Sequence, residues 1–129
     1  MRREQQRLAD YLGHLLEAIE RIDRYTDAMD ERAFLENPMV QDAVIRNFEV
    51  IGEASHNIET RYPAFAAANP ELPLAFAYQM RNAVAHGYFQ VDLAIVWNTI
   101  HSDLPRLRQQ VRQLLEGMPR DDNDSRTTP

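Results

Sequence analysis

Residues 37–63, NPMVQDAVIRNFEVIGEASHNIETRYP, carry the clearest helical pattern of the chain. Their apolar side chains recur every three or four positions, at Val40, Val44, Phe48, Ile51, Ala54 and Ile58. This spacing is typical of an amphipathic helix that buries one face. Asn37 suits the N-cap and Pro38 the first helical position, while Pro63 disfavours helical geometry in the residue before it. We therefore expect a helix from residue 38 to about residue 60.

A longer stripe of the same kind precedes this helix. From about residue 3 to residue 29 the apolar positions are Leu8, Tyr11, Leu12, Leu15, Ile19, Ile22 and Tyr25. They form one face of a second amphipathic helix. Residues 30–36 are predicted to connect the two helices. Residues 63–73 contain three prolines and an alanine cluster, which favours a loop with at most one short turn of helix.

Two further helices are expected after this loop. The third runs from about Leu74 to Ala85, and Gly87 can supply the residue that closes it. The fourth begins near Asp92, a suitable N-cap, and Pro105 lies inside it, so we expect a kink there. Its apolar stripe is Leu93, Val96, Trp97, Ile100, Leu104, Leu107, Val111 and Leu114. With no stretch of period-two alternation, the predicted fold class is all-α, an up-and-down four-helix bundle with a kinked last helix.

The composition supports one domain. Residues 1–118 form the predicted helical domain, and the polar residues 119–129 a disordered tail. Hydrophobic content of 44% and charged content of 26% are ordinary for a globular protein. No apolar run approaches the length of a membrane span, and the basic N-terminus is not followed by the apolar region of a secretory signal. Cysteine is absent, which excludes disulfides and thiolate metal sites and fits a reducing cytoplasm, the expected location.

The net charge of −6 argues against a surface built for indiscriminate nucleic-acid binding. Such binding draws on a broad basic field that displaces counterions from phosphate groups. If RNA is the substrate, it must be held by a local basic site or by a dimer groove that concentrates positive charge.

A candidate for such a local site is the pair Arg81 and His86. These residues are five positions apart, so a regular helix would rotate them by about 140° relative to each other. They can converge if the helix ends between them, and Gly87 directly after His86 favours such an ending. That geometry would place a guanidinium and an imidazole together at a helix terminus.

This pair suits attack on a phosphodiester. A histidine can accept or donate a proton near neutral pH, and an arginine offers a planar donor fork that matches phosphate oxygens. One group would assist the 2′-hydroxyl of RNA as it attacks the phosphorus, and the other would neutralise the developing charge, without a metal. Asn82 could orient the phosphate or fix the histidine tautomer. The alternative is that Arg81 lies at the bundle surface and that His86 is a helix C-terminal residue favoured by the macrodipole.

The segment MRNAVAHGYF, residues 80–89, resembles the signature of the HepT family of HEPN proteins, which is an arginine, four residues, a histidine, one residue and a tyrosine. Other stretches resemble the same family in the same order, at residues 25–26, 40–46, 51–54, 91–97 and 103–105. The resemblance spans roughly residues 3–116, so it is specific.

The resemblance implies a toxin of a toxin–antitoxin module whose partner is MntA, a minimal nucleotidyltransferase. It implies a homodimer in which two motifs share a cleft and act as a metal-independent endoribonuclease. Carried over by position, Arg81 and His86 are the catalytic pair and Asn82 follows the arginine. Tyr88 is the tyrosine to which the partner attaches AMP. ATP would be the partner's substrate, and no cofactor is implied for this chain.

Two smaller features allow other interpretations. Glu53 and His56 form an E-x-x-H pattern, but a di-iron carboxylate bundle needs two such patterns and further carboxylates, so no metal site is expected. Arg46, Glu49 and Glu53 could form a buried network behind the motif, or Arg46 and Glu49 could be a solvated pair. The functional alternative is a non-catalytic helical module that docks a nucleotidyltransferase.

Overall fold

The computed structural model describes residues 2–74, 77 and 92–118. In this part of the chain there are six helices and no strand, which confirms the all-α prediction. The helices are α1 (Arg2–Thr26), α2 (Glu31–Leu35), α3 (Pro38–Arg61), α4 (Pro63–Ala68), α6 (Leu93–Ser102) and α7 (Leu104–Gly117).

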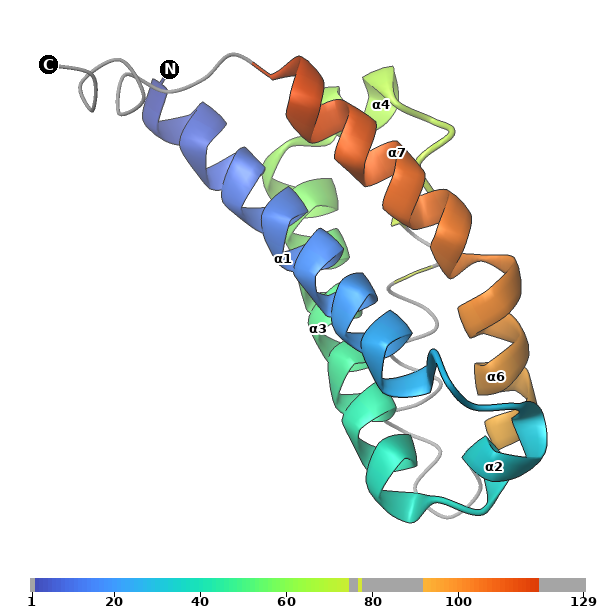
Figure 1. Cartoon of the computed structure of the whole chain (residues 1–129). Coiled ribbons are helices and arrows are strands. Elements are labelled where there is room, and N and C mark those ends of the chain that lie inside the picture. The colour runs from blue at the N-terminus through green and yellow to red at the C-terminus, as the bar shows by residue number, and fades with distance from the viewer. Residues whose placement is uncertain (1, 75–76, 78–91, 119–129) are drawn as a thin grey trace, which may run out of the picture.

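The bundle is organised around α1 and α3, which run antiparallel along each other (Figure 1). Helix α7 lies beside α1 and ends near the start of α1, at the same end of the bundle as α4. Helix α2 closes the opposite end, where it contacts the beginnings of α3 and α6. The molecule is therefore an elongated bundle with two different ends.

The core is the seam between α1, α3 and α7. Side chains with no exposed surface come from all three helices, among them Leu12, Leu15, Ile22, Val44, Ile58 and Val111. The stripe quoted from residues 37–63 therefore faces the core as predicted. Tyr25 is a correction, since it was assigned to the buried face of α1 and is 39% exposed. Its neighbour Thr26 is buried instead, and the Thr26 hydroxyl donates to the Ile22 carbonyl at 2.8 Å.

The prediction that residues 30–36 only connect two helices was wrong, because they contain α2. The Ala33 N–H donates to the Asp30 carboxylate at 2.8 Å, so Asp30 is the N-cap of this helix. Phe34 is completely buried, and its ring lies 5.3 Å from the ring of Trp97. One buried aromatic side chain therefore fixes a helix of five residues in place.

The expected kink near Pro105 is a full break between α6 and α7. Helix α6 ends at Ser102 and α7 begins at Leu104, with Asp103 between them. Pro105 lies in the first turn of α7, where its missing N–H has no partner in any case. The Asp103 N–H still donates to the Thr99 carbonyl at 3.0 Å, so the two helices follow each other without a loop.

The remaining predictions concern residues 63–85 and the tail. Helix α4 falls in the expected loop and is slightly longer than the single turn predicted. The third helix was expected over residues 74–85, of which the structure describes only Leu74 and Ala77; the Ala77 N–H donates to the Pro73 carbonyl at 3.0 Å. The expected tail, residues 119–129, lies outside the described residues. No helix in the described part is both long and apolar enough to cross a bilayer.

Replacing Phe34 by alanine tests the role of α2. We expect the free energy of unfolding to fall by about 3–5 kcal/mol, because a fully buried aromatic side chain is removed. The matched control is Leu35→Ala, at a side chain that is 42% exposed, where a change within about 0.5 kcal/mol is expected. Urea unfolding followed by circular dichroism measures both. Equal losses in the two variants would contradict the assigned role of Phe34.

Candidate active site

The motif residues Arg81, Asn82, His86 and Tyr88 lie outside the described residues, which stop at Ala77 and resume at Asp92. The structure therefore shows how the two flanks of the motif are held, and which groups the neighbouring helices present.

The upstream flank is fixed in the core. Ala77 is only 5% exposed, and Leu72 and Leu74 before it are also buried. Ala77 borders a small void of about 20 Å³ together with Phe48, Ile51, Pro73, Thr99, Asp103, Leu104 and Leu107. These residues belong to the middle of α3, the end of α6 and the start of α7. Ala77, the last described residue before the motif, therefore lies near the C-terminal end of α6.

The downstream flank is fixed by a helix cap. The Asp92 carboxylate accepts hydrogen bonds from the Ala94 N–H at 3.1 Å and the Ile95 N–H at 3.2 Å, which makes it the N-cap of α6. Helix α6 has ten residues, so the two flanks are separated by a helix about 15 Å long. The described residues on either side of the motif, Ala77 and Asp92, therefore lie near opposite ends of α6.

Trp97 lies in the middle of α6 and packs against two other rings. Its ring lies 5.3 Å from that of Phe34 and 4.2 Å from that of His101. The His101 Nδ1 also lies 3.0 Å from the Trp97 carbonyl oxygen. Trp97 packs against the core as expected, and with two rings against it the indole is not a free platform for stacking a base.

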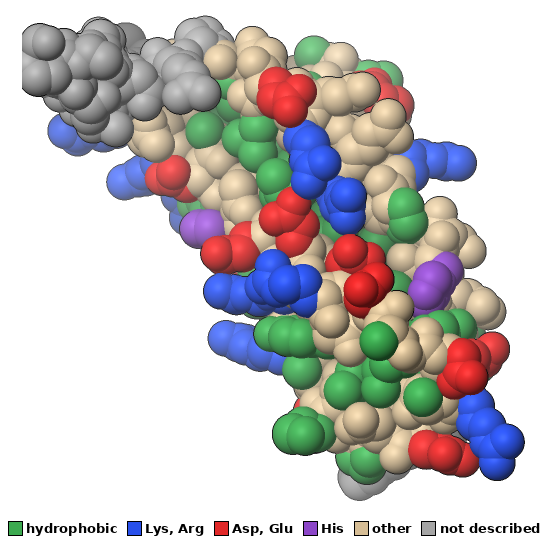
Figure 2. All heavy atoms as spheres, viewed as in Figure 1, with side chains coloured by type: hydrophobic (Ala, Val, Ile, Leu, Met, Phe, Trp, Pro, Cys, Tyr) green, Lys and Arg blue, Asp and Glu red, His purple; other side chains and the backbone are tan. Residues whose placement is uncertain are grey.

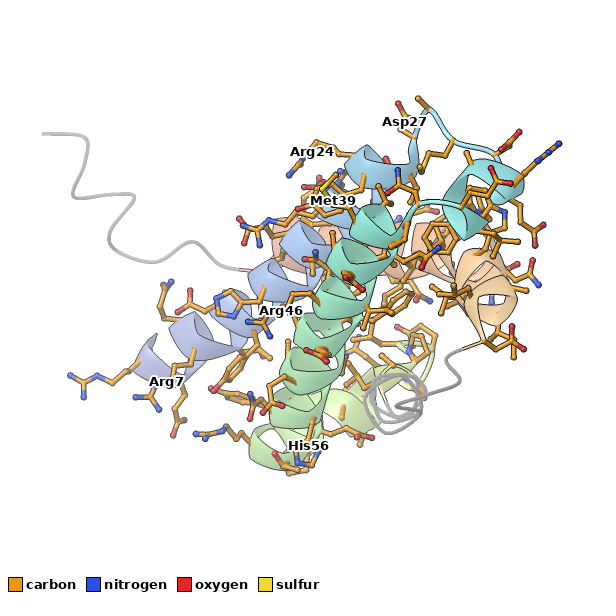
Figure 3. All side chains as sticks on the ribbon, turned by 90° about the horizontal axis from the view of Figure 1, so that it is seen from below. Arg7, Arg24, Asp27, Met39, Arg46 and His56 are labelled. Atoms are coloured by element: carbon orange, nitrogen blue, oxygen red, sulfur yellow. The ribbon has the colours of Figure 1, made fainter. Side chains whose placement is uncertain are left out.

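The expected network of Arg46, Glu49 and Glu53 lines a groove of about 360 Å³ between α1 and α3. Arg46 is on the stretch of α3 that runs beside α1 (Figure 3). The Arg46 and Glu49 side chains are 3.5 Å apart and 74% and 35% exposed. Glu53 is exposed as well. Of the two alternatives, the exposure of Arg46 and Glu53 in the single chain favours the solvated pair, and a role behind the motif stays a prediction.

Glu53 and His56, the E-x-x-H pair, are on the same helix. Glu53 lines the groove with Tyr11 and His14 of α1, and His56 is half-buried. Across the described ranges no three His, Cys, Asp or Glu side chains are placed to hold a metal ion together.

Burial raises the pKa of Tyr62, with a smaller contribution from Tyr11. The Tyr62 hydroxyl donates to the Glu4 carbonyl oxygen at 3.0 Å and ties the end of α3 to the start of α1. This shift follows from helix packing, so it does not mark Tyr62 as a catalytic group.

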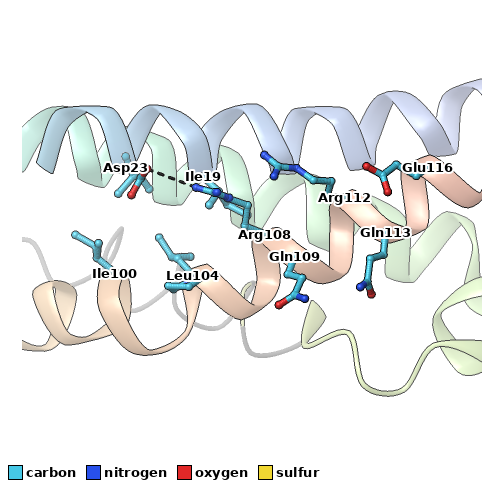
Figure 4. Close-up of a pocket in the computed structure, with 11 residues that line it drawn as sticks. Ile19, Asp23, Ile100, Leu104, Arg108, Gln109, Arg112, Gln113 and Glu116 are labelled. Atoms are coloured by element: carbon cyan, nitrogen blue, oxygen red, sulfur yellow. Dashed lines mark hydrogen bonds and ion pairs between the residues drawn. The ribbon is translucent and has the colours of Figure 1, made fainter. Parts of the chain in front are cut away.

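Two of the three arginines of α7, Arg108 and Arg112, are engaged with α1. They line a groove of about 560 Å³ between the two helices (Figure 4). Arg112 contacts Glu20 at 2.8 Å and Arg108 contacts Asp23 at 3.5 Å. Acidic and basic side chains are consequently mixed along this face (Figure 2). The partners of Arg108 and Arg112 are 85 and 92 positions away in the chain, so sequence spacing alone does not reveal them.

Comparison with known proteins places these observations in a family. The family described as "Ribonuclease HepT-like" matches residues 15–114, which include the motif segment. The chain belongs to the HepT-like ribonuclease family. The resemblance expected from residues 80–89 is thereby confirmed at the level of the family, and HepT-like ribonucleases are the class to which the site must be compared.

Several relatives share most of the chain. A "Probable ribonuclease HepT" of Thermococcus cleftensis is 39% identical over 81% of this chain and 93% of its own length. A "Putative RNase" of Caldanaerobacter subterraneus subsp. tengcongensis is 30% identical over 82% of this chain and 92% of its own length. A "Gamma-glutamylcyclotransferase and putative RNase" of Methanocaldococcus jannaschii is 34% identical over 88% of this chain, which spans only half of that protein. No solved structure matches the chain.

Substitution of Asp92 tests the anchor that follows the motif. We expect Asp92→Ala to lower the free energy of unfolding by about 1 kcal/mol, because the N–H groups of Ala94 and Ile95 lose their acceptor. Asp92→Asn is the matched control, since asparagine caps helices about as well as aspartate, and it should keep nearly all of the stability. Denaturant unfolding gives both values. An asparagine variant as unstable as the alanine variant would contradict the capping role.

Proposed function

We propose that this chain is the toxin of a toxin–antitoxin pair and that it cleaves RNA in the cytoplasm as a metal-independent endoribonuclease. The observation that carries the proposal is the sequence Arg81, four residues, His86, one residue and Tyr88 inside the region that matches the HepT-like ribonuclease family. The names of the relatives agree with this chemistry, since each includes a ribonuclease.

In this proposal Arg81 and His86 divide the reaction between them. His86 accepts the proton of the 2′-hydroxyl as that oxygen attacks the phosphorus; the bond from phosphorus to the 5′-oxygen breaks, and the leaving 5′-oxygen takes up a proton from water. Accepting a proton suits a group titrating near neutral pH. Arg81 stabilises the negative charge that develops on the phosphorus oxygens. Asn82 positions the phosphate. Arg46, Glu49 and Glu53 would support the motif from α3.

The charge distribution supports a homodimer as the active form. The net charge is −6, and Arg108 and Arg112 are each paired with an acidic side chain of α1. Arg108 and Arg112 therefore do not form a free basic patch for RNA along α7. Two copies of Arg81 facing one cleft would supply the positive charge locally.

We further propose that a nucleotidyltransferase of the MntA kind is the antitoxin. It would transfer AMP from ATP to the Tyr88 hydroxyl with release of pyrophosphate. The added phosphate would place a negative charge two residues from His86, where it would occupy Arg81 and exclude the RNA phosphate.

The catalytic assignment is tested with Arg81→Ala and His86→Ala. Expression of the parent chain should arrest growth, and both variants should relieve the arrest. Purified protein with labelled RNA and a chelator should retain cleavage, and each variant should cleave roughly 10²–10⁴-fold more slowly because a proton-transfer or charge-stabilising group is lost.

The matched controls are His14→Ala and Arg106→Ala, exposed residues on α1 and α7, which should cleave like the parent. Full activity of folded Arg81→Ala and His86→Ala, or loss of activity on adding chelator, would overturn the proposal in favour of a non-catalytic module or a metal-dependent nuclease.

The switch is tested with Tyr88→Phe. Incubation of the parent with the nucleotidyltransferase and ATP should increase its intact mass by one adenylyl group and abolish RNA cleavage. Tyr88→Phe should keep its mass and its activity. Tyr25→Phe, at an exposed tyrosine on α1, should behave as the parent. An adenylyl group that persists in Tyr88→Phe would disprove the assigned site.

A further inference from the structure

The end of the bundle closed by α2 carries an unusual concentration of exposed apolar side chains. In the described part of the chain, four large hydrophobic residues are exposed: Tyr25 at 39%, Leu35 at 42%, Met39 at 77% and Ile95 at 53%. They lie on the last turn of α1, the end of α2, the first turn of α3 and the first turn of α6. All four positions are at the same end of the bundle (Figure 1). We define residues 25–42 and 92–95 as the acidic end.

This end is well packed underneath. Phe34 and Trp97 join α2 to α6, and the Gln41 side chain donates to the Phe34 carbonyl oxygen at 2.8 Å, which joins α2 to α3. Leu35 and Met39 therefore project from ordered helices and are not needed to fill the core. Single exposed apolar residues are common, but a group of them on one surface is typical of a contact site.

The same end accounts for most of the net negative charge of the chain. It contains six acidic residues and one arginine, a net charge of −5, compared with −6 for all 129 residues. The six acidic residues, all exposed, are Asp27, Asp30, Glu31, Glu36, Asp42 and Asp92. Asp30 and Asp92 cap helices, and Glu36 contacts Arg32 at 3.5 Å. Arg24, Asp27 and Met39 lie at this end together in Figure 3, so Arg24 at the edge of the acidic end offsets one of its negative charges.

The combination of exposed apolar side chains and negative charge narrows the range of molecules that can bind to the acidic end. RNA would be repelled by a surface of charge −5. A second copy binding through the same surface would place two such surfaces against each other, since a two-fold contact uses the same patch on both chains. A protein surface with apolar side chains surrounded by lysines or arginines would complement both properties.

We propose that the acidic end is a docking surface for a partner protein that presents apolar side chains within a basic rim. Met39 and Leu35 supply the apolar contact, and Asp27, Glu31 and Asp42 the charge complementarity. This surface does not depend on the proposed ribonuclease activity. A partner seated on it would adjoin Asp92, the anchor that follows the motif segment.

The test uses the full chain and designed helical peptides of about 18 residues. One peptide has leucines on one face and lysines elsewhere, a second has glutamates in place of the lysines, and a third has serines in place of the leucines. Fluorescence anisotropy should show saturable binding of the leucine–lysine peptide. The other two peptides should bind at least about tenfold more weakly.

Variants then locate the binding. The double variant Leu35→Ser and Met39→Ser, and separately Asp42→Lys, should each weaken binding of the leucine–lysine peptide by about tenfold or more. The matched control is Glu116→Lys, at an exposed acidic residue on the last turn of α7, which should bind like the parent. His86→Ala should also bind like the parent, which separates this result from the ribonuclease test. Circular dichroism checks that each variant is folded.

Four results would overturn the inference. They are no binding of the leucine–lysine peptide, equal binding of the leucine–glutamate peptide, and equal weakening by Glu116→Lys. The fourth is a loss of self-association or of RNA binding in the serine double variant, which would assign the surface to a second copy or to RNA.

Discussion

The antiparallel packing of α1 against α3 is the constraint on which the other elements depend. Apolar burial governs this seam even where a polar group lies in it: the Ser55 hydroxyl on α3 is fully buried and has no hydrogen-bond partner among the described residues. An unpaired buried hydroxyl costs about 1–3 kcal/mol. The cost is tolerated because Ile51, Ala54 and Ile58 bury their side chains on the same helix. Helix α7 then packs along the side of this pair, and α2 and α4 lie at its opposite ends.

The packing at the α2 end links the fold to the candidate site. Phe34 is inserted between α3 and α6 and supports Trp97, and Trp97 belongs to the helix that Asp92 caps. On the other side, Ala77 is held against α3, α6 and α7. Both flanks of the motif segment therefore depend on α6, and α6 depends on α2. A short helix far from the motif in sequence is thus part of the support of the motif.

The sequence predicted the helices whose apolar residues recur at regular helical spacing. The stripes of residues 3–29 and 38–60 place α1 and α3 within a few residues of their observed ends, because a long buried face imposes the helical period. Helix α2 was missed because five residues with one buried side chain cannot show a period. The contacts of Arg108 and Arg112 with α1 were missed because they join distant positions that only the fold brings together. At the site, the five-residue spacing of Arg81 and His86 is common by chance, so family resemblance had to select it.

The distribution of charge would keep the two proposed roles of this acidic chain apart: docking of a basic partner protein at the acidic end, and binding of RNA phosphates at the motif. A chain of net charge −6 that acts on RNA must keep its negative charge away from the phosphates. Here the acidic end holds a net charge of −5, and Glu20 and Asp23 are paired with arginines of α7. The other residues of the chain together have a net charge of only −1. On such a surface a single guanidinium, doubled across a dimer cleft, can dominate the local potential, which is the condition that the proposed use of Arg81 requires.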